Sequence, residues 1–329
     1  MVQIILIGLA AAAAAALLVA SLASGSLLSI VLLYMAPLPI MIAALGWSHL
    51  AGLLAAFAAA AALAVTFGGL FFIGFMVAVG LPAWWLGYLA LLARRVGTTG
   101  DVEWYPVGRM VVWGAVLGTV VVACAILSFG FDAAAFRAGL RRAIDIILSG
   151  KEADAAVAPL ELPGIANAEQ FVDLLVVTIP PTAAAGFSLI SLGNLWLAAR
   201  IVKVSGRLRR PWPELAAMSF PRTTAALLAL AVAGMLAPRL FGGGTDLIGL
   251  ISRVLCASLL MAYTILGLAV LHATTRGLRG RAFVLAGTYA SVAVLGWPAL
   301  LMTLVGLAEG ALDIRGRIAR TRRPPNMTS

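Results

Sequence analysis

The sequence predicts an all-α polytopic membrane protein, and its composition and hydropathy pattern are the observations that favour this class. Of its 329 residues, 63% are hydrophobic and 11% are charged, and the mean hydropathy is +1.06. A soluble globular domain has roughly 45–50% apolar and about 25% charged residues. Several apolar runs reach the ~20 residues that cross the hydrocarbon core of a bilayer. Because these runs are continuous, without the alternation of a membrane β-barrel, we expect transmembrane helices.

Ten apolar segments are candidate spans of this helical bundle. They are residues 3–23, 27–46, 48–67, 69–93, 107–129, 171–200, 219–238, 247–272, 282–296 and 298–314. Short breaks join the first four segments and predict antiparallel neighbours. We expect the first segment to be an uncleaved span rather than a signal peptide, because no positively charged region precedes its apolar run. Eight spans is the alternative count, if the N-terminal hairpins are re-entrant or if residues 282–314 do not cross twice.

Basic side chains cluster in the connections between these spans and predict their orientation. Most of the 23 lysine and arginine residues lie in four clusters, at 94–95, 200–210, 276–281 and 315–323. Cytoplasmic connections of membrane proteins carry an excess of such residues. Ten spans with both termini in the cytoplasm place all four clusters on that side. This placement also accounts for the net charge of +10, so we expect no nucleic-acid partner.

The spans divide the chain into four predicted regions. We expect an N-terminal bundle of five spans, an extracytoplasmic amphipathic helix with a loop, a C-terminal bundle and a basic cytoplasmic tail, at residues 1–129, 130–170, 171–314 and 315–329. In the second region, apolar residues recur at helical spacing from Phe131 to Leu148, and arginines occupy much of the other face. This helix is interpreted either as a lid over an outward-facing cavity or as a connector that lies on lipid headgroups.

Two proline pairs interrupt apolar spans. Pro37 and Pro39 lie in the middle of the second span, and Pro180 and Pro181 lie in the sixth. A proline removes a backbone hydrogen bond and kinks the helix. In lipid, the carbonyl that loses its partner needs another one inside the protein or in a wet cavity. Broken helices of this kind line substrate sites in transporters, so these four prolines are candidate cavity residues. The alternative is that the kinks only shape helix packing.

Two polar residues within spans are further candidates for this site. Asn194 lies near the cytoplasmic end of the sixth span, and Arg253 lies within the outer part of the eighth. A polar side chain inside a membrane is unfavourable unless it has a partner. For Asn194 a structural role at a helix interface is the first interpretation. Arg253 is an isolated cation, and an anionic partner or ligand near the mouth of an outward-facing cavity is plausible for it.

The sequence lacks the motifs that would indicate catalysis. It has no P-loop, no HExxH metal site and no GxSxG nucleophile elbow, and it contains only two histidines and two cysteines. We therefore expect no enzymatic activity, no cofactor and no metal. Any transport would take its energy from a gradient or from a separate partner, such as a membrane coupling protein or an ATPase.

Three short stretches carry a resemblance to a known family. They are "APLP" in the second span, "NLWLAARIVKVSGRLRRPWPELAAMSFP" from Asn194 to Pro221, and "GLAEGALDIRGR" from Gly306 to Arg317. With the topology, they resemble the YybS-like family of uncharacterised bacterial inner-membrane proteins. The core of that family is similar to the S components of energy-coupling-factor transporters. The resemblance implies a small-molecule cavity open to the outside, a membrane-embedded coupling partner and a place in the bacterial inner membrane.

Two hypotheses for function follow. In the first, the protein is a small-molecule binding or transport component, with its site lined by Pro37, Pro39, Pro180, Pro181, Asn194 and Arg253. In the second, it is a non-enzymatic membrane scaffold or assembly factor that binds a partner through its basic cytoplasmic loops, above all through Arg207, Arg209 and Arg210. A third and weaker idea is a lipid-handling protein, because arginine-rich loops suit anionic headgroups.

Overall fold

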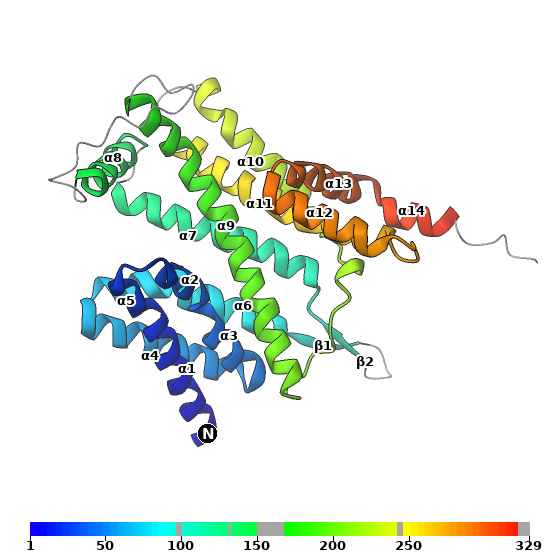
Figure 1. Ribbon diagram of the computed structural model, residues 1–329, viewed down its shortest axis with the longest axis horizontal. Coiled ribbons are helices and arrows are strands. Elements are labelled where there is room, and N and C mark those ends of the chain that lie inside the picture. Colours follow the sequence, from blue (N-terminus) through cyan, green and yellow to red (C-terminus); the bar gives the residue numbers. More distant parts are fainter. Residues whose placement is uncertain (97–100, 131–132, 150–167, 242–245, 322–329) are drawn as a thin grey trace, which may run out of the picture. The chain divides into compact units, whose positions relative to one another are not determined.

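The computed structural model describes residues 1–96, 101–130, 133–149, 168–241 and 246–321. Within these residues the chain is almost entirely helical (Figure 1). The loop that the sequence predicts after the amphipathic helix, within residues 130–170, and the end of the predicted basic tail lie outside these described residues.

The helices follow the predicted apolar segments. They are α1 Val2–Ala20, α2 Leu27–Met35, α3 Pro37–Gly46, α4 His49–Phe67, α5 Leu70–Phe75, α6 Leu81–Leu91, α7 Val107–Phe129, α8 Ala133–Ser149, α9 Ala168–Val204, α10 Arg222–Phe241, α11 Asp246–Thr274, α12 Arg281–Leu295, α13 Pro298–Leu312 and α14 Ile314–Thr321. Between α6 and α7, the strands β1 Ala93–Val96 and β2 Asp101–Trp104 form an antiparallel hairpin. In its register Arg94 is opposite Glu103, and the two side chains form an exposed salt bridge.

The short breaks between the first helices have local causes. Gly25 and Gly68 end helical segments with φ of 64° and 103°, a region that favours glycine. Ser26 and Ser48 then cap the N-termini of α2 and α4, because each hydroxyl accepts a hydrogen bond from a backbone N–H three residues on. These turns fix the antiparallel pairing that the sequence predicts.

Eight helical stretches among the described residues are long and apolar enough to cross a membrane. They are Val2–Ser24, Leu27–Gly46, His49–Phe67, Leu70–Leu91, Val107–Phe129, Asp173–Val204, Arg222–Phe241 and Asp246–Thr274. The last two segments predicted as spans form α12 and α13, with 15 residues each. At 1.5 Å per residue each reaches ~22 Å, less than the ~30 Å hydrocarbon core. Among the described residues, eight helical stretches are therefore long enough to span the membrane, and this number equals the alternative count of eight spans rather than ten.

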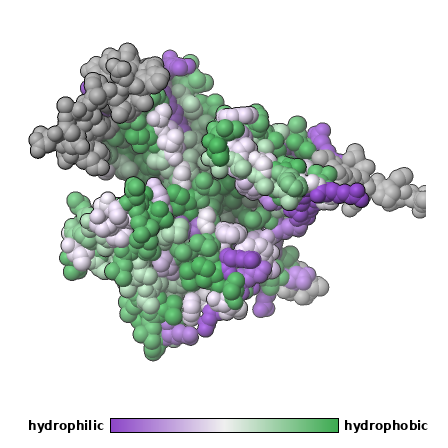
Figure 2. Space-filling view, viewed as in Figure 1, coloured by the Kyte–Doolittle hydropathy of each residue, from purple (hydrophilic) through white to green (hydrophobic). Residues whose placement is uncertain are grey.

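The surface of the described residues is that of a protein surrounded by lipid. Many large apolar side chains are exposed, among them Val65, Leu70 and Phe283, at 89%, 83% and 85% of their full exposure. Figure 2 shows hydrophobic residues over most of the visible face, with hydrophilic residues gathered in patches. Soluble monomers rarely expose contiguous apolar area on this scale. Together with the eight long apolar helices, this defines an all-α polytopic membrane protein.

The described chain divides into two compact units that interleave in sequence. Unit 1 comprises Met1–Gly114, Ser188–Ala225 and Leu260–Ser329, and unit 2 comprises Ala115–Phe187 and Ala226–Leu259. Helices α7, α9, α10 and α11 contribute residues to both. This division groups residues by their contacts, whereas the predicted regions, with boundaries at residues 129, 170 and 314, follow sequence order. The predicted regions stay a prediction.

Unit 2 contains the predicted amphipathic helix, α8. Phe136 of α8 is 5% exposed and belongs to a core cluster with Ile126, Val176, Ala184, Leu250 and Val254, and Leu140 packs against the same cluster. The apolar face of α8 thus packs on α7, α9 and α11 of this unit rather than facing water.

In unit 1, small residues let the helices pack closely. Helix α4 packs against α1, α3 and α6, and its Ala51, Ala55 and Ala59 are fully buried. Helices α11 and α13 approach most closely at Gly267 and Gly306. A Cβ atom added to either glycine would collide with the main chain of the other helix. Close approach through small residues is how membrane helices gain packing energy when lipid is as apolar as they are.

Gly306→Ala is expected to destabilise the protein, because its new methyl group would meet the carbonyl of Tyr263 and push α13 away from α11. Overpacking of this kind costs about 1–3 kcal/mol. Thermal unfolding in mild detergent measures the effect. The matched control is Gly287→Ala in α12, where nothing lies within 4 Å of the added carbon. Equal melting temperatures for both variants would contradict the close contact.

Candidate ligand-binding cavity

The break predicted at the first proline pair is present, and Asn194 completes it. Helix α2 ends at Met35 and α3 begins at Pro37. The last carbonyls of a helix lack partners within it. The Asn194 side chain, 1% exposed on α9, donates a hydrogen bond of 2.9 Å from Nδ2 to the Tyr34 carbonyl in that last turn. Asn194 is therefore the protein partner that the broken helix requires in a membrane.

The other prolines behave differently. Helix α9 runs without interruption through Pro180 and Pro181, so the helix break that we expected there does not occur. The physical reason is that a proline holds φ near the helical value, and the helix tolerates the lost donors. Another buried proline, Pro82, follows a π-helical turn at Met76–Gly80, which widens the helix before it.

The predicted outward-facing site is not assembled within either unit alone. Pro37, Pro39 and Asn194 belong to unit 1, and Pro180, Pro181 and Arg253 belong to unit 2. Arg253 is half-buried on α11, and it has no hydrogen bond or ion pair with a described residue. A shared cavity for these residues stays a prediction.

Asn194→Ala is expected to lower stability by about 1–3 kcal/mol, because it leaves the Tyr34 carbonyl buried without a partner. Thermal unfolding in detergent gives the measurement. Ser205→Ala serves as the control, since the Ser205 hydroxyl is exposed and donates to the Ile201 carbonyl of its own helix end. If the two variants melt together, the Asn194 bond contributes nothing to the fold.

The connection between α9 and α10, residues 205–221, is the segment that organises this part of unit 1; we call it the strap. Arg210 of the strap donates to the carbonyl of Tyr105 at 2.8 Å and to that of Ala90 at 3.5 Å. Burial lowers the pKa of Arg210 from its ordinary value, but the guanidinium stays charged because arginine titrates far above neutral pH. Arg209 donates to the Trp47 carbonyl, and the Arg207 guanidinium lies 4.6 Å above the Trp47 ring.

A second arginine binds the strap from the C-terminal side. Arg315 follows α13 and pairs with Glu309, with 2.7 Å between Nε and Oε1. The remaining guanidinium nitrogens donate to the carbonyls of Ala216 and Met218 in the strap. Glu309 and Arg315 are 6% and 17% exposed, so this pair is largely desolvated, and the hydrogen bonds from all three guanidinium nitrogens offset part of the desolvation cost.

These contacts bring the predicted basic clusters to one end of unit 1. The strap contacts the segment after β2 through Arg210, the segment after α11 through the Arg276–Glu214 pair, and the segment after α13 through Arg315. Beside it, Lys203 lies 4.7 Å from the centre of the Trp212 ring. The prediction that these clusters share one side is consistent with these contacts.

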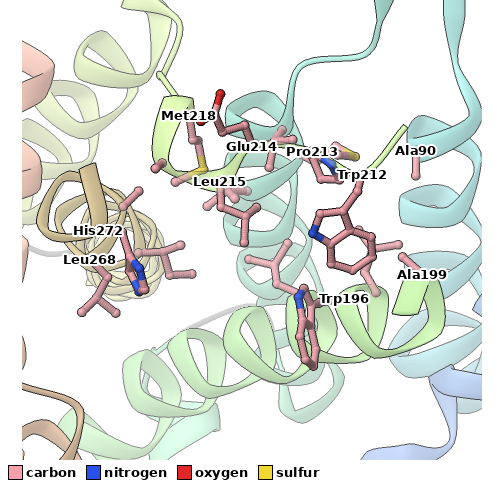
Figure 3. Close-up of a pocket in the computed structure, with 18 of the residues that line it drawn as sticks. Ala90, Trp196, Ala199, Trp212, Pro213, Glu214, Leu215, Met218, Leu268 and His272 are labelled. Carbon is pink, nitrogen blue, oxygen red and sulfur yellow. The ribbon is translucent and has the colours of Figure 1, made fainter. Parts of the chain in front are cut away.

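Beneath the strap lies a partly enclosed cavity of about 490 Å³. Its walls come from α3, α6, α7, α9, α11, the strap, the segment after α11 and α12. Figure 3 shows Trp196 and Trp212 beside the hollow, with Leu268 and His272 of α11 on the opposite side. Most other lining residues are aliphatic, such as Leu195, Met110 and Ala269. Its size and apolar lining are typical of sites that bind small molecules.

A few polar groups interrupt this apolar lining. The His272 ring nitrogen Nε2 and the Tyr289 hydroxyl lie 2.9 Å apart and share a hydrogen bond. Arg276 pairs with Glu214, and both are more than half exposed. Arg281, the first residue of α12, also lines the cavity, and its Nε is buried without a hydrogen-bond partner among the described residues. No group of three or more His, Cys, Asp or Glu side chains in the described ranges is placed to hold a metal ion.

Sequence reasoning missed this cavity and most of its lining. Of the predicted site residues, Arg210 alone is among its lining residues. Arg207 and Arg209 are exposed, although Arg209 also donates to the Trp47 carbonyl, and Arg210 is half-buried and donates to the carbonyls of Tyr105 and Ala90. The available signal was the strap itself, where "RRPWPE" places a tryptophan between two prolines after a basic run.

Fold and cavity together define a polytopic α-helical membrane protein with a potential ligand site at its arginine-rich end. Comparison with family models agrees with this class: residues 12–308 match the family described as "Predicted membrane protein (DUF2232)". The chain belongs to that family. No curated protein matches the chain, and no solved structure matches it.

Proposed function

We propose that this protein is a membrane component that binds a small molecule in the cavity beneath the strap. The observation that carries the proposal is the cavity itself, about 490 Å³ in volume and lined by several segments that are distant in sequence. Two tryptophans and many aliphatic side chains offer apolar contact area, and a few polar groups can orient a ligand. A catalytic role is not proposed.

The orientation in the membrane is part of this proposal. The basic clusters that the strap contacts lie at the end of unit 1 that also holds the cavity. Because positively charged connections favour the cytoplasm, we place the cavity at the cytoplasmic side of a bacterial inner membrane, with both termini inside. This differs from the outward-facing site that the resemblance to S components implies, so we do not carry that site over.

A coupling partner remains part of the proposal, because the sequence offers no motif for hydrolysing ATP. A YybS-like protein with an S-component-like core would bind its ligand and leave energy conversion to another membrane protein. The scaffold hypothesis is the alternative. It is favoured by Arg207 and Arg209, whose side chains are exposed at the same end of unit 1.

Ala199→Phe tests the binding proposal. Ala199 lines the cavity from α9, and a phenyl ring there would fill space that a ligand needs. We expect native mass spectrometry of protein released from membranes in mild detergent to show a retained small molecule on the wild type and its loss from the variant. The control is Leu189→Phe, an exposed position of the same helix within unit 1. Equal retention by wild type and Ala199→Phe would contradict a ligand site in this cavity.

A further inference from the structure

The charges around the cavity do not balance. Its lining includes the cations Arg210, Arg276 and Arg281, and Glu214 is the one carboxylate among the lining residues. Glu214 is engaged by Arg276. Arg210 donates to the carbonyls of Tyr105 and Ala90, which are neutral acceptors and do not neutralise its charge. The cavity therefore has a net excess of positive charge.

Arg281 is the cation without a described partner. It is half-buried, and its Nε is buried with no hydrogen-bond acceptor among the described residues. Burying a hydrogen-bond donor without a partner costs free energy, and the cost is larger when the donor belongs to a charged group. Such a group therefore favours an acceptor beyond those that the described residues supply.

The position of Arg281 strengthens this preference for an anion. It is the first residue of α12, and the N-cap residue Gly280 provides no side-chain hydrogen bond to the helix end. The N-terminus of a helix carries a partial positive charge and unsatisfied N–H groups. The partial positive charge of this helix end thus adds to the charge of the Arg281 guanidinium, which lines the cavity.

The rest of the lining excludes a purely polar anion. Trp196, Trp212 and Leu268 line the cavity and offer only apolar or aromatic surface, apart from the indole N–H groups. Burying a polar body against these side chains would leave its groups without partners. A ligand that matches both the Arg281 guanidinium and the apolar lining has an apolar body and one anionic group.

We propose, on the basis of the proposed binding function, that the cavity takes an amphiphilic anion, with its carboxylate or phosphate at Arg281 and its apolar body between the tryptophans and α11. Such a molecule can come from two sources: a water-soluble organic acid, or an anionic lipid of the surrounding leaflet. The chemistry of recognition is the same for both.

Binding of dodecanoate and of uncharged dodecanol to the full chain in phosphatidylcholine nanodiscs tests this inference. We expect dodecanoate to bind more tightly, and Arg281→Gln to weaken dodecanoate binding by about ten- to one-hundredfold, as the loss of a charge-assisted hydrogen bond would. Dodecanol binding should not change. The matched control is Arg279→Gln, an exposed arginine two residues earlier that does not line the cavity.

The two ligands distinguish an anion site at Arg281 from a cavity that binds only apolar molecules. If both ligands bind with equal affinity, or if Arg281→Gln weakens both alike, the anion site is wrong while the cavity still binds apolar molecules. If neither ligand binds to the wild type, both proposals fail. Nanodiscs that also contain phosphatidylglycerol identify the source: competition with dodecanoate assigns the site to a lipid, and undiminished binding assigns it to a water-soluble acid.

Discussion

Inside a bilayer, polar groups find hydrogen-bond partners only within the protein, and the rest of this structure depends on that constraint. The pairing of Asn194 with the Tyr34 carbonyl is its clearest expression, because one buried amide allows α2 and α3 to separate at a proline. The hydroxyls of Thr264 and Thr303 follow the same constraint. Their oxygens lie 2.7 Å apart between α11 and α13 and share a hydrogen bond, and each oxygen is also within hydrogen-bond distance of a carbonyl of its own helix.

The strap shows how an irregular segment can exist beside an apolar cavity. Its backbone does not follow a helix over most of its length, so its carbonyls need other donors. Arg315 supplies two of these donors, and Arg210 in turn satisfies carbonyls of the segments around Ala90 and Tyr105. The arginines from which the sequence predicts the orientation of the chain therefore also hold together the wall of the cavity. Basic clusters that hydropathy analysis treats as topological signals have a structural role here.

Much of the fold could be predicted from the sequence, since apolar runs and their breaks are local properties. The span predicted at 107–129 coincides with α7, and that at 247–272 lies within α11. The break at Pro37 followed from proline chemistry, but the same reasoning failed at Pro180 and Pro181, where α9 continues. Whether a proline breaks a membrane helix depends on which neighbours can satisfy the backbone, and the sequence alone does not show them.

The cavity could not be predicted because it depends on contacts between distant parts of the chain. Arg210 and Tyr105 are 105 residues apart, and Arg315 and Ala216 are 99 residues apart. Hydropathy and charge predict that these segments share one side of the membrane, but they do not indicate that the strap folds over α9 and α11. In the sequence, Arg281 is one of the basic residues of the cluster at 276–281. Only the burial of its Nε beside the cavity distinguishes it from the others.

The central claim is that the bilayer surrounds this helical bundle and that its basic connections share the cytoplasmic side. Single cysteines at Arg207 and Arg317, both exposed, test it most directly in a chain whose Cys124 and Cys256 are replaced by alanine. Labelling with a membrane-impermeant maleimide is compared between right-side-out and inverted vesicles of the cytoplasmic membrane. We predict that both positions react in inverted vesicles and neither reacts in right-side-out ones. Reaction of the two positions from opposite sides would contradict the account.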